Sequence, residues 1–220
     1  MEPILHPAWL SLNGENMPIK SPDGLDTKKL QAEIKAIYSK VATNPHEDFH
    51  FHRGPAFAEQ FLGYDPNDLK DLPTENTASF AGVGNPHVIS PITEGETVVD
   101  IGSGAGTDLF IAAKKVGPSG RATGIDMTDE MIEHARSGIK KLGLKHVDIR
   151  KGDAENIPVD DNSVDVVITN GVLNLTSDKL KAFSEIARIL KPGARLHYSD
   201  IIMEGVLSEN ARKNIDLWTG

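Results

Sequence analysis

The distribution of apolar and polar positions changes character near Glu96. From there on, short apolar segments alternate with longer ones in which apolar residues recur every three or four positions, as in strands alternating with helices. The predicted strands are 97–101, 121–126, 147–151, 164–169 and 196–203, and the predicted helices are 107–116, 129–142 and 178–190. This order predicts an α/β fold, a Rossmann-like doubly wound parallel sheet with right-handed crossovers.

The segment before this alternation is less regular. Residues 1–25 are rich in Pro, Gly and Asn and are interpreted as an irregular leader. Apolar residues then recur at helical spacing over 27–42, which predicts an amphipathic helix, and a short helix is expected at 55–62. We therefore predict two parts: a leader with a helical cap at residues 1–90, and a Rossmann-like domain at 91–220.

Local residue chemistry predicts where two helices begin and end. Thr128 is expected to cap the helix that starts at Asp129, because a hydroxyl at this position can accept a hydrogen bond from a free backbone N–H. Pro192-Gly193 is expected to stop the helix at 178–190 and to form the turn into the last strand.

Composition narrows the possible partners and compartment. The net charge of −9 disfavours a nucleic-acid partner, and the longest apolar runs are too short for a membrane helix. Residues 1–20 lack the basic start and apolar stretch of a signal peptide. The absence of cysteine excludes disulfides, thiolate metal sites and cysteine nucleophiles. The expected compartment is the cytoplasm.

The strongest functional signal is the glycine-rich segment that follows the first predicted strand. The chain reads Val98-Val99-Asp100-Ile101-Gly102-Ser103-Gly104-Ala105-Gly106, and Asp126 ends the next strand 20 residues later. A turn of glycines allows backbone to approach a ligand, because no Cβ stands in the way. An acid after the second strand is placed to accept hydrogen bonds from ribose hydroxyls. Together these features predict a crevice that binds a nucleoside.

The glycine spacing distinguishes between kinds of nucleotide site. The dinucleotide fingerprint G-x-G-x-x-G requires glycine where this chain has Thr107, and no Gly-Lys-Ser/Thr follows as in a P-loop. The observed D-x-G-x-G-x-G resembles the first motif of class I S-adenosylmethionine (SAM) dependent methyltransferases. A glycine-rich turn in another α/β protein is the alternative, and an NAD-dependent oxidoreductase is less favoured.

The resemblance implies roles for further residues. Met127 would contact the adenine, Asp153 would accept from its amino group, and the Ala154 N–H would meet a ring nitrogen. Asn170 could hold the amino end of the cofactor or a substrate. A core methionine, a Gly-Asp turn and a strand-end turn residue are the structural alternatives. The expected cofactor-binding residues are Asp100, Gly102, Ser103, Gly104, Gly106, Asp126, Met127, Asp153, Ala154 and Asn170.

From about residue 36 to the end, the chain looks like arsenite methyltransferases and their relatives. The resemblance lies in Tyr38-Ser39-Lys40-Val41, Phe80–Pro86, Asp100–Asp108, Gly124–Thr128, Asn170–Leu175 and Leu217–Gly220. It implies thiols that hold arsenite at Gly171, within residues 82–84, and soon after residue 218. Because this chain has no cysteine, methyl transfer from SAM to another small molecule is expected.

The number of strands raises a further question. The family normally has seven strands, whereas five fit before Gly220. Either the chain is a fragment of a longer protein or a truncated relative, or a partner covers the edge of strand five, for example in a homodimer. A non-catalytic subunit that binds SAM or mediates dimerisation is therefore kept as an alternative function.

The histidines offer no clear assignment. His46, His50 and His52 match no established zinc pattern, so no metal site is predicted. His50, His52 and Tyr38 are candidates to touch the substrate. If the acceptor is a hydroxyl or an amine, a base such as His50, His52 or His87 would be needed. No catalytic residue is assigned.

Overall fold

The five strands form one parallel sheet. A computed structural model describes residues 24–202 and 208–219 of the chain. The strands lie in the order β3-β2-β1-β4-β5, and every pair of neighbours is parallel. Their bounds are β1 Thr97–Ile101, β2 Arg121–Asp126, β3 Val147–Lys151, β4 Val164–Asn170 and β5 Leu190–Ser199. The predicted α/β class and the doubly wound sheet are confirmed.

The order of the strands creates the crevice. The chain winds outward from β1 through β2 to β3, then returns to the other side of β1 for β4 and β5. The winding direction therefore reverses between β1 and β4, and ligands bind at the carboxyl ends of strands at such a point. Asp100 and Asp126 lie at or near the ends of β1 and β2. The topology thus brings the sequence motifs to one edge of the sheet.

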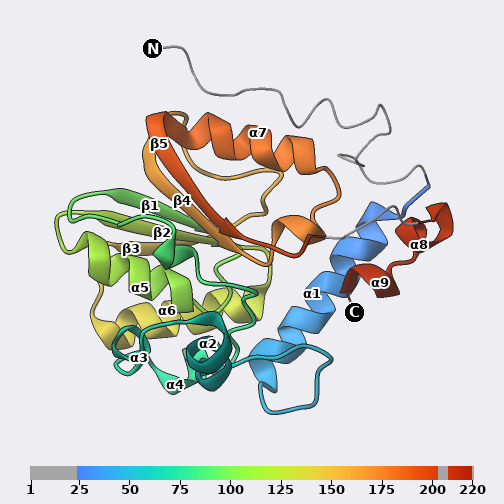
Figure 1. The fold of residues 1–220 in the computed structure, drawn as a ribbon, viewed down its shortest axis with the longest axis horizontal. Helices are drawn as coiled ribbons and strands as arrows, with labels where there is room; N and C mark the ends of the chain where they lie inside the picture. Colours follow the sequence, from blue (N-terminus) through green and yellow to red (C-terminus); the bar gives the residue numbers. More distant parts are fainter. Residues whose placement is uncertain (1–23, 203–207, 220) are drawn as a thin grey trace.

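Helices cover both faces of the sheet (Figure 1). Helices α5 (Thr107–Val116) and α6 (Asp129–Leu142) lie on one face, and α7 (Lys179–Ile189) lies on the other. On the first face, Phe110 packs with Ile132, and on the second, Ile186 packs with Val167. Both faces of the central strands are therefore buried, which explains their continuous apolar sequence.

Both helices predicted before the sheet are present, together with three shorter helical elements. Its elements are α1 Thr27–Thr43, α2 Pro55–Leu62, α3 Pro66–Leu69, α4 Thr74–Thr77 and the 3-10 turn η2 Pro86–Val88. Helix α1 starts after Asp26, whose carboxylate accepts the Lys29 N–H at 2.9 Å. It packs against α6 and against α9 (Asp216–Thr219). The remaining short elements are η3 Leu173–Leu175 and α8 Glu209–Lys213.

The predicted start and end of strand five were wrong. Helix α7 ends at Ile189, and the strand runs over residues 190–199 instead of 196–203. Leu190 is already extended, with φ −69° and ψ 134°, and the pairing with β4 shifts register between Val164 and Val166. Pro192 and Gly193 lie in this irregular part of the strand, which is a bulge. The helix ends before them because Pro cannot continue a helix and biases the residue before it towards extended backbone.

The predicted cap at Thr128 also differs from the structure. Thr128 occupies the N-cap position of α6, but its side chain makes no capping hydrogen bond. Its backbone N–H instead donates to Asp126 Oδ1 at 2.8 Å. The acid at the end of β2 therefore organises the entry into α6.

Two expectations concern the remaining parts of the chain. The predicted leader falls almost wholly outside the described residues. Within the part of the chain that the structure describes, no helix is both long and apolar enough to cross a bilayer.

Candidate functional site

A pocket opens at the carboxyl ends of the strands. It encloses about 1110 Å³ of open space, including the part open to solvent. Its walls come from α1, the segment before η2, the turn between β1 and α5, and the ends of β2, β3 and β4. The pocket therefore lies where ligands bind in open α/β sheets, at the carboxyl ends of the strands.

The turn after β1 requires glycine at two positions in the pocket wall. Gly102 and Gly104 have φ values of +68° and +53°, a region that L side chains rarely adopt. A Cβ on Gly102 would lie 2.2 Å from a methyl carbon of Val172. On Gly104, it would meet nothing closer than the Met131 sulfur at 3.8 Å. The absence of a side chain therefore leaves space for a ligand beside Gly104, whereas Gly102 allows the turn to pack against Val172.

Asp126 connects this turn to the second strand. Its Oδ2 accepts the Gly104 N–H and its Oδ1 accepts the Thr128 N–H, both at 2.8 Å. Burial raises its pKa, although these hydrogen bonds act in the opposite direction. Each carboxylate oxygen can accept a further hydrogen bond. Asp126 can therefore bind two adjacent hydroxyls while its backbone contacts hold the carboxylate in place.

Two buried polar atoms beside the glycine turn have no partner. Asp100 Oδ2 and Ser103 Oγ make no hydrogen bond within the described residues. Burial raises the pKa of Asp100 well above its usual range, and the nearby Asp108 and Asp126 carboxylates raise it further. An unpaired buried acceptor costs about 1–3 kcal/mol. The site is thus suited to a ligand that brings a cationic donor to Asp100.

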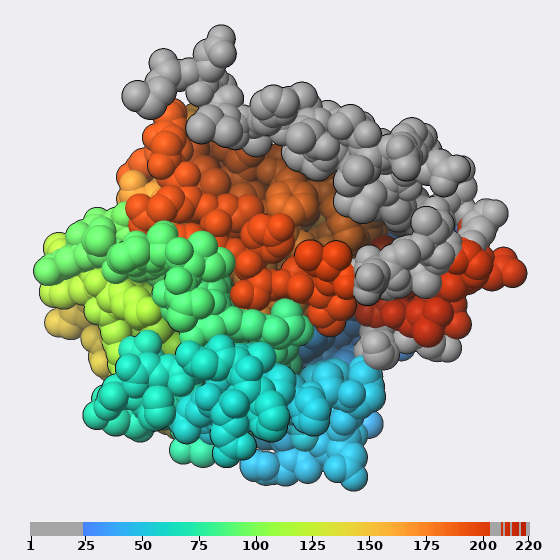
Figure 2. Space-filling view, in the orientation of Figure 1, coloured from blue at the N-terminus to red at the C-terminus, as the bar shows by residue number. Residues whose placement is uncertain are grey.

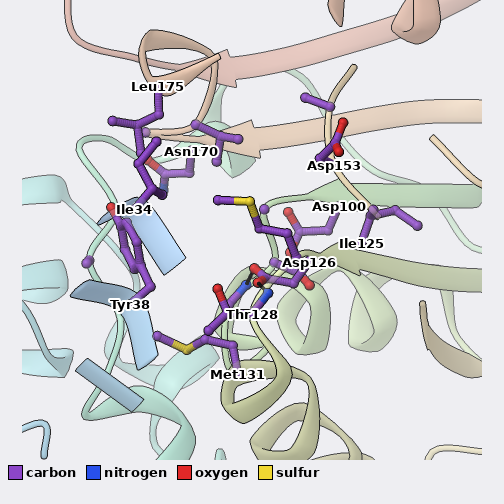
Figure 3. A pocket seen from close by; sticks show the side chains of 18 of the residues that line it. Ile34, Tyr38, Asp100, Ile125, Asp126, Thr128, Met131, Asp153, Asn170 and Leu175 are labelled. Carbon is purple, nitrogen blue, oxygen red and sulfur yellow. Dashed lines mark hydrogen bonds between the residues drawn. The ribbon is translucent and has the colours of Figure 1, made fainter. Parts of the chain in front are cut away.

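The residues expected at the adenine also line the pocket. Met127 is half-buried there and does not belong to the core. Asp153 lies opposite α1, and the buried Ala154 follows it (Figure 3). Asp153 also forms a turn, since its carbonyl accepts the Asn156 N–H at 3.2 Å and its Oδ1 accepts the Glu155 N–H at 2.8 Å. The turn and a ligand contact are compatible.

Asn170 lines the pocket, but its side chain is occupied by the protein itself. Its carbonyl oxygen accepts the N–H groups of Val83 at 2.8 Å and Gly84 at 3.2 Å. Its amide nitrogen lies within 3.1 Å of the Gly84 carbonyl, the Tyr64 hydroxyl and Asp108 Oδ2. Asn170 therefore fastens the segment at 83–84 to the end of β4, and its two hydrogens already have acceptors.

Asp108 is held by the same network. Its Oδ1 receives the Tyr64 hydroxyl at 2.7 Å and lies 3.0 Å from His87 Nε2. These three side chains are buried, and they come from positions 21 to 44 residues apart in the chain. The network supports the pocket wall from behind.

Some expected residues lie elsewhere. Gly106 is absent from the pocket lining: it precedes α5, and a Cβ there would lie 2.8 Å from the Phe110 ring. His50 and His52 are exposed, and their rings lie against Phe51 and Phe57 at 5.0 and 5.1 Å. No histidine lines the pocket within the described ranges, and no cluster there could hold a metal ion.

One wall of the pocket was not anticipated. Leu30, Gln31, Ile34 and Tyr38 line it from α1, and of these only Tyr38 was a candidate. Leu30, Ile34 and Tyr38 recur every four residues and Gln31 lies three before Ile34, which places them along one side of the helix. The amphipathic pattern indicated that this face is buried, but it contained no information on what the face covers.

The geometry fits SAM. The open glycine backbone, the two free acceptor positions of Asp126 and the unpaired Asp100 oxygen suit an amino acid joined to a nucleoside. Asp100 and Gly104 would hold the amino-acid part, Asp126 the ribose, and Met127, Asp153 and Ala154 the adenine. These assignments remain predictions.

Comparison with known proteins supports this view of the fold. The methyltransferase domain family matches residues 92–219. An arsenite methyltransferase of Halobacterium salinarum is 39% identical over 165 residues, which are 75% of this chain and 42% of that protein. One of Mus musculus is 33% identical over 202 residues, covering 88% of this chain and 53% of that protein. The chain thus spans about half the length of these curated relatives.

A solved structure is similar to this chain in both sequence and fold. The arsenic(III) SAM methyltransferase of Chlamydomonas reinhardtii is 36% identical, with a TM-score of 0.63, and the match covers 76% of this chain and 55% of that one. The family match, the strand order and the glycine-acid crevice agree: this chain belongs to the class I SAM-dependent methyltransferases.

Proposed function

We propose that this chain transfers a methyl group from SAM to a small molecule other than thiolate-bound arsenite. The observation that carries the proposal is the contact between Val83 and Gly171. The resemblance to arsenite methyltransferases places thiols at Gly171 and within residues 82–84. In this chain, a Cβ on Gly171 would lie 3.3 Å from a methyl carbon of Val83. Hydrocarbon occupies the place where sulfur ligands would be expected.

The chemistry of arsenic gives this contact its meaning. Soft metal and metalloid centres select thiolate ligands, and the chain contains no cysteine. Neither a valine methyl group nor a glycine can coordinate arsenic. The proposal therefore retains the cofactor of the family and changes the acceptor.

The chain's contribution to transfer would be to position and desolvate the reactants. When bound, SAM supplies an activated methyl group that an acceptor lone pair takes, while the carbon–sulfur bond breaks and its electron pair stays on sulfur. Asp126 and the glycine turn would orient the cofactor, and α1, which forms one wall of the pocket, would exclude water from it. None of the histidines considered as bases lines the pocket in the described residues, and an acceptor atom with a free lone pair needs no base.

Two measurements test the proposal. Calorimetry should show binding of SAM and of S-adenosylhomocysteine (SAH), with no binding of NADH. Methyl-tritiated SAM should then label compounds in a small-molecule extract, and inorganic arsenite with glutathione should give no methylated arsenic above the blank. Methylation of arsenite would overturn the choice of acceptor. SAM binding with no labelled product would favour the non-catalytic alternative.

A further inference from the structure

We propose that the acceptor is an uncharged, largely apolar small molecule that accepts a hydrogen bond from the Tyr38 hydroxyl. This inference rests on the proposed function and specifies the class of its substrate. Three observations carry it, all made on the described residues: the labelled carboxylates lie on one side of the pocket, no cation lines it, and the Tyr38 hydroxyl on the opposite side has no partner.

The labelled carboxylates lie on one side of the pocket, where Ile125 also lies, and three residues of the opposite side carry no charge (Figure 3). Asp100, Asp126 and Asp153 gather on the side formed by the ends of β1, β2 and β3. Ile34, Tyr38 and Leu175 lie across from them. Since the first side fits the cofactor, the second is the space left for the acceptor.

Several apolar residues line the pocket on or near the acceptor side. Ile34 is buried, and the apolar residues that line the pocket with it include Ala81, Val172 and Leu175. Val83 does not line the pocket, but it lies next to Gly171, which does. A charged group placed here would lose its hydration without gaining a partner.

The negative charge of the lining disfavours an anionic acceptor, in addition to the cost of losing hydration. Five carboxylates line the pocket, and no Lys, Arg or His does so within the described residues. An anionic acceptor would meet only like charge. A cationic acceptor would have to compete with the amino and sulfonium groups of SAM for the carboxylates on the far side. A neutral molecule avoids both costs.

Tyr38 supplies a polar contact on this side. Its ring stacks on Phe51 with centroids 6.2 Å apart, and its hydroxyl makes no hydrogen bond to another described residue. Burial, with the Asp126 and Asp200 carboxylates, raises the pKa of Tyr38 to about 12. The phenol therefore keeps its proton at neutral pH and can donate it to an oxygen or nitrogen of the acceptor.

Neighbouring polar side chains are less available. The Asn170 amide is taken up by residues 64, 83, 84 and 108. The Thr176 hydroxyl donates to the Leu173 carbonyl at 2.7 Å, and the Ser177 hydroxyl donates to Glu155 at 2.8 Å. The Tyr38 hydroxyl therefore remains available to donate to the acceptor.

The test uses three probes of one size that differ in charge at pH 7. These are 2-naphthol (neutral), 2-naphthoate (anionic) and 2-naphthylmethylammonium (cationic). Each is titrated by calorimetry into the protein saturated with SAH. We expect 2-naphthol to bind at least tenfold more tightly than either ion. Tyr38→Phe should weaken 2-naphthol binding about three- to tenfold, as expected for one hydrogen bond, and leave SAH affinity within twofold.

Two further variants act as controls. Tyr198→Phe removes a hydroxyl from an exposed tyrosine outside the pocket and should change neither affinity. Leu175→Lys adds a cation to the acceptor side and should strengthen naphthoate binding while SAH binding is retained.

The possible outcomes separate the two proposals. Three outcomes would each overturn the acceptor inference while SAH still binds. Naphthoate or the ammonium probe could bind as tightly as 2-naphthol, none of the three probes could bind, or Tyr38→Phe could leave the affinity for 2-naphthol unchanged. Failure of SAH to bind would contradict the proposed function itself, and the acceptor inference with it.

Discussion

At the scale of single residues, the cofactor site depends on carboxylates whose surroundings differ. Asp126 accepts two backbone hydrogen bonds, whereas Asp100 Oδ2 is buried without a partner in the described residues. The first carboxylate is held in a fixed orientation, and the second is kept in an unfavourable environment. These differences lead to two predictions, one on affinity and one on stability.

We predict that Asp126→Ala weakens SAH binding by about 1–3 kcal/mol, because charge-assisted hydrogen bonds to the ribose are lost. Isothermal titration calorimetry measures the effect, with circular dichroism to confirm folding. Asp129→Ala is the matched control: this exposed carboxylate lies three residues further on and bonds Lys151 instead of lining the pocket. An Asp126→Ala variant that binds SAH as tightly as the unaltered chain would refute the assignment.

Asp100 should make stability depend on pH. Because burial raises its pKa in the folded state, the stability it contributes is present below the unfolded pKa and is lost as pH rises through the folded value. Asp100→Asn removes this titration. We expect the melting temperature of the variant, relative to the unaltered chain, to rise between about pH 4, near the unfolded pKa, and pH 8. A difference that stays constant across this range would contradict the raised pKa.

At the scale of elements, the turn from β1 to α5 shows how a loop is held by distant contacts. The Gly102 N–H donates to the Ile125 carbonyl at 2.8 Å, which ties the turn to β2. Val172, after β4, fills the space where a Gly102 side chain would lie. Three strands therefore meet at one glycine.

This contact can be separated from the effect of backbone conformation. Gly102 and Gly143 have similar φ values of +68° and +65°, but no atom of the described residues lies within 4 Å of a Cβ added to Gly143. We predict that Gly143→Ala lowers the free energy of unfolding by about 1 kcal/mol, from strain alone. Gly102→Ala should lose about 1–3 kcal/mol more, from overpacking. Denaturant unfolding measures both.

A second substitution checks the cause. Val172→Ala in the Gly102→Ala background should restore part of the loss, because it removes the methyl groups that clash. Equal losses of unfolding free energy in Gly102→Ala and Gly143→Ala would show that crowding against Val172 has no effect.

At the scale of the whole molecule, β5 forms one edge of the sheet in the described residues. Orange-red side chains of the region around β5 reach the surface of the face shown in Figure 2. Tyr198 is 45% exposed and Phe183 is 40% exposed, and their rings meet at 6.3 Å. An open strand edge beside exposed aromatic rings favours association.

A homodimer through this edge stays a prediction. Sedimentation velocity at micromolar concentration should show a dimer, and Tyr198→Lys should shift it towards the monomer. Phe61→Lys places the same charge on an exposed ring of α2 and should leave the dimer intact. A monomeric unaltered chain, or a dimer that persists in Tyr198→Lys, would contradict the prediction.

The sequence by itself determined the elements whose signals are local. Strands β1, β2 and β3 and helices α5 and α6 have the predicted bounds, because apolar period and glycine position act over a few residues. The order of these elements then implied the sheet, and the motif spacing implied the crevice. Nine of the ten expected cofactor residues line the pocket, which brings them together without testing their roles.

Only the tertiary structure decided features that depend on distant partners. Asn170 is occupied by groups 62 to 106 residues earlier in the chain, and Gly106 packs against Phe110 instead of the pocket. The start of β5 depends on its bulged pairing with β4, and the role of α1 depends on what its buried face covers. The physical reason is the same throughout: periodicity indicates that a side chain is buried, whereas its partner is determined by how the elements pack.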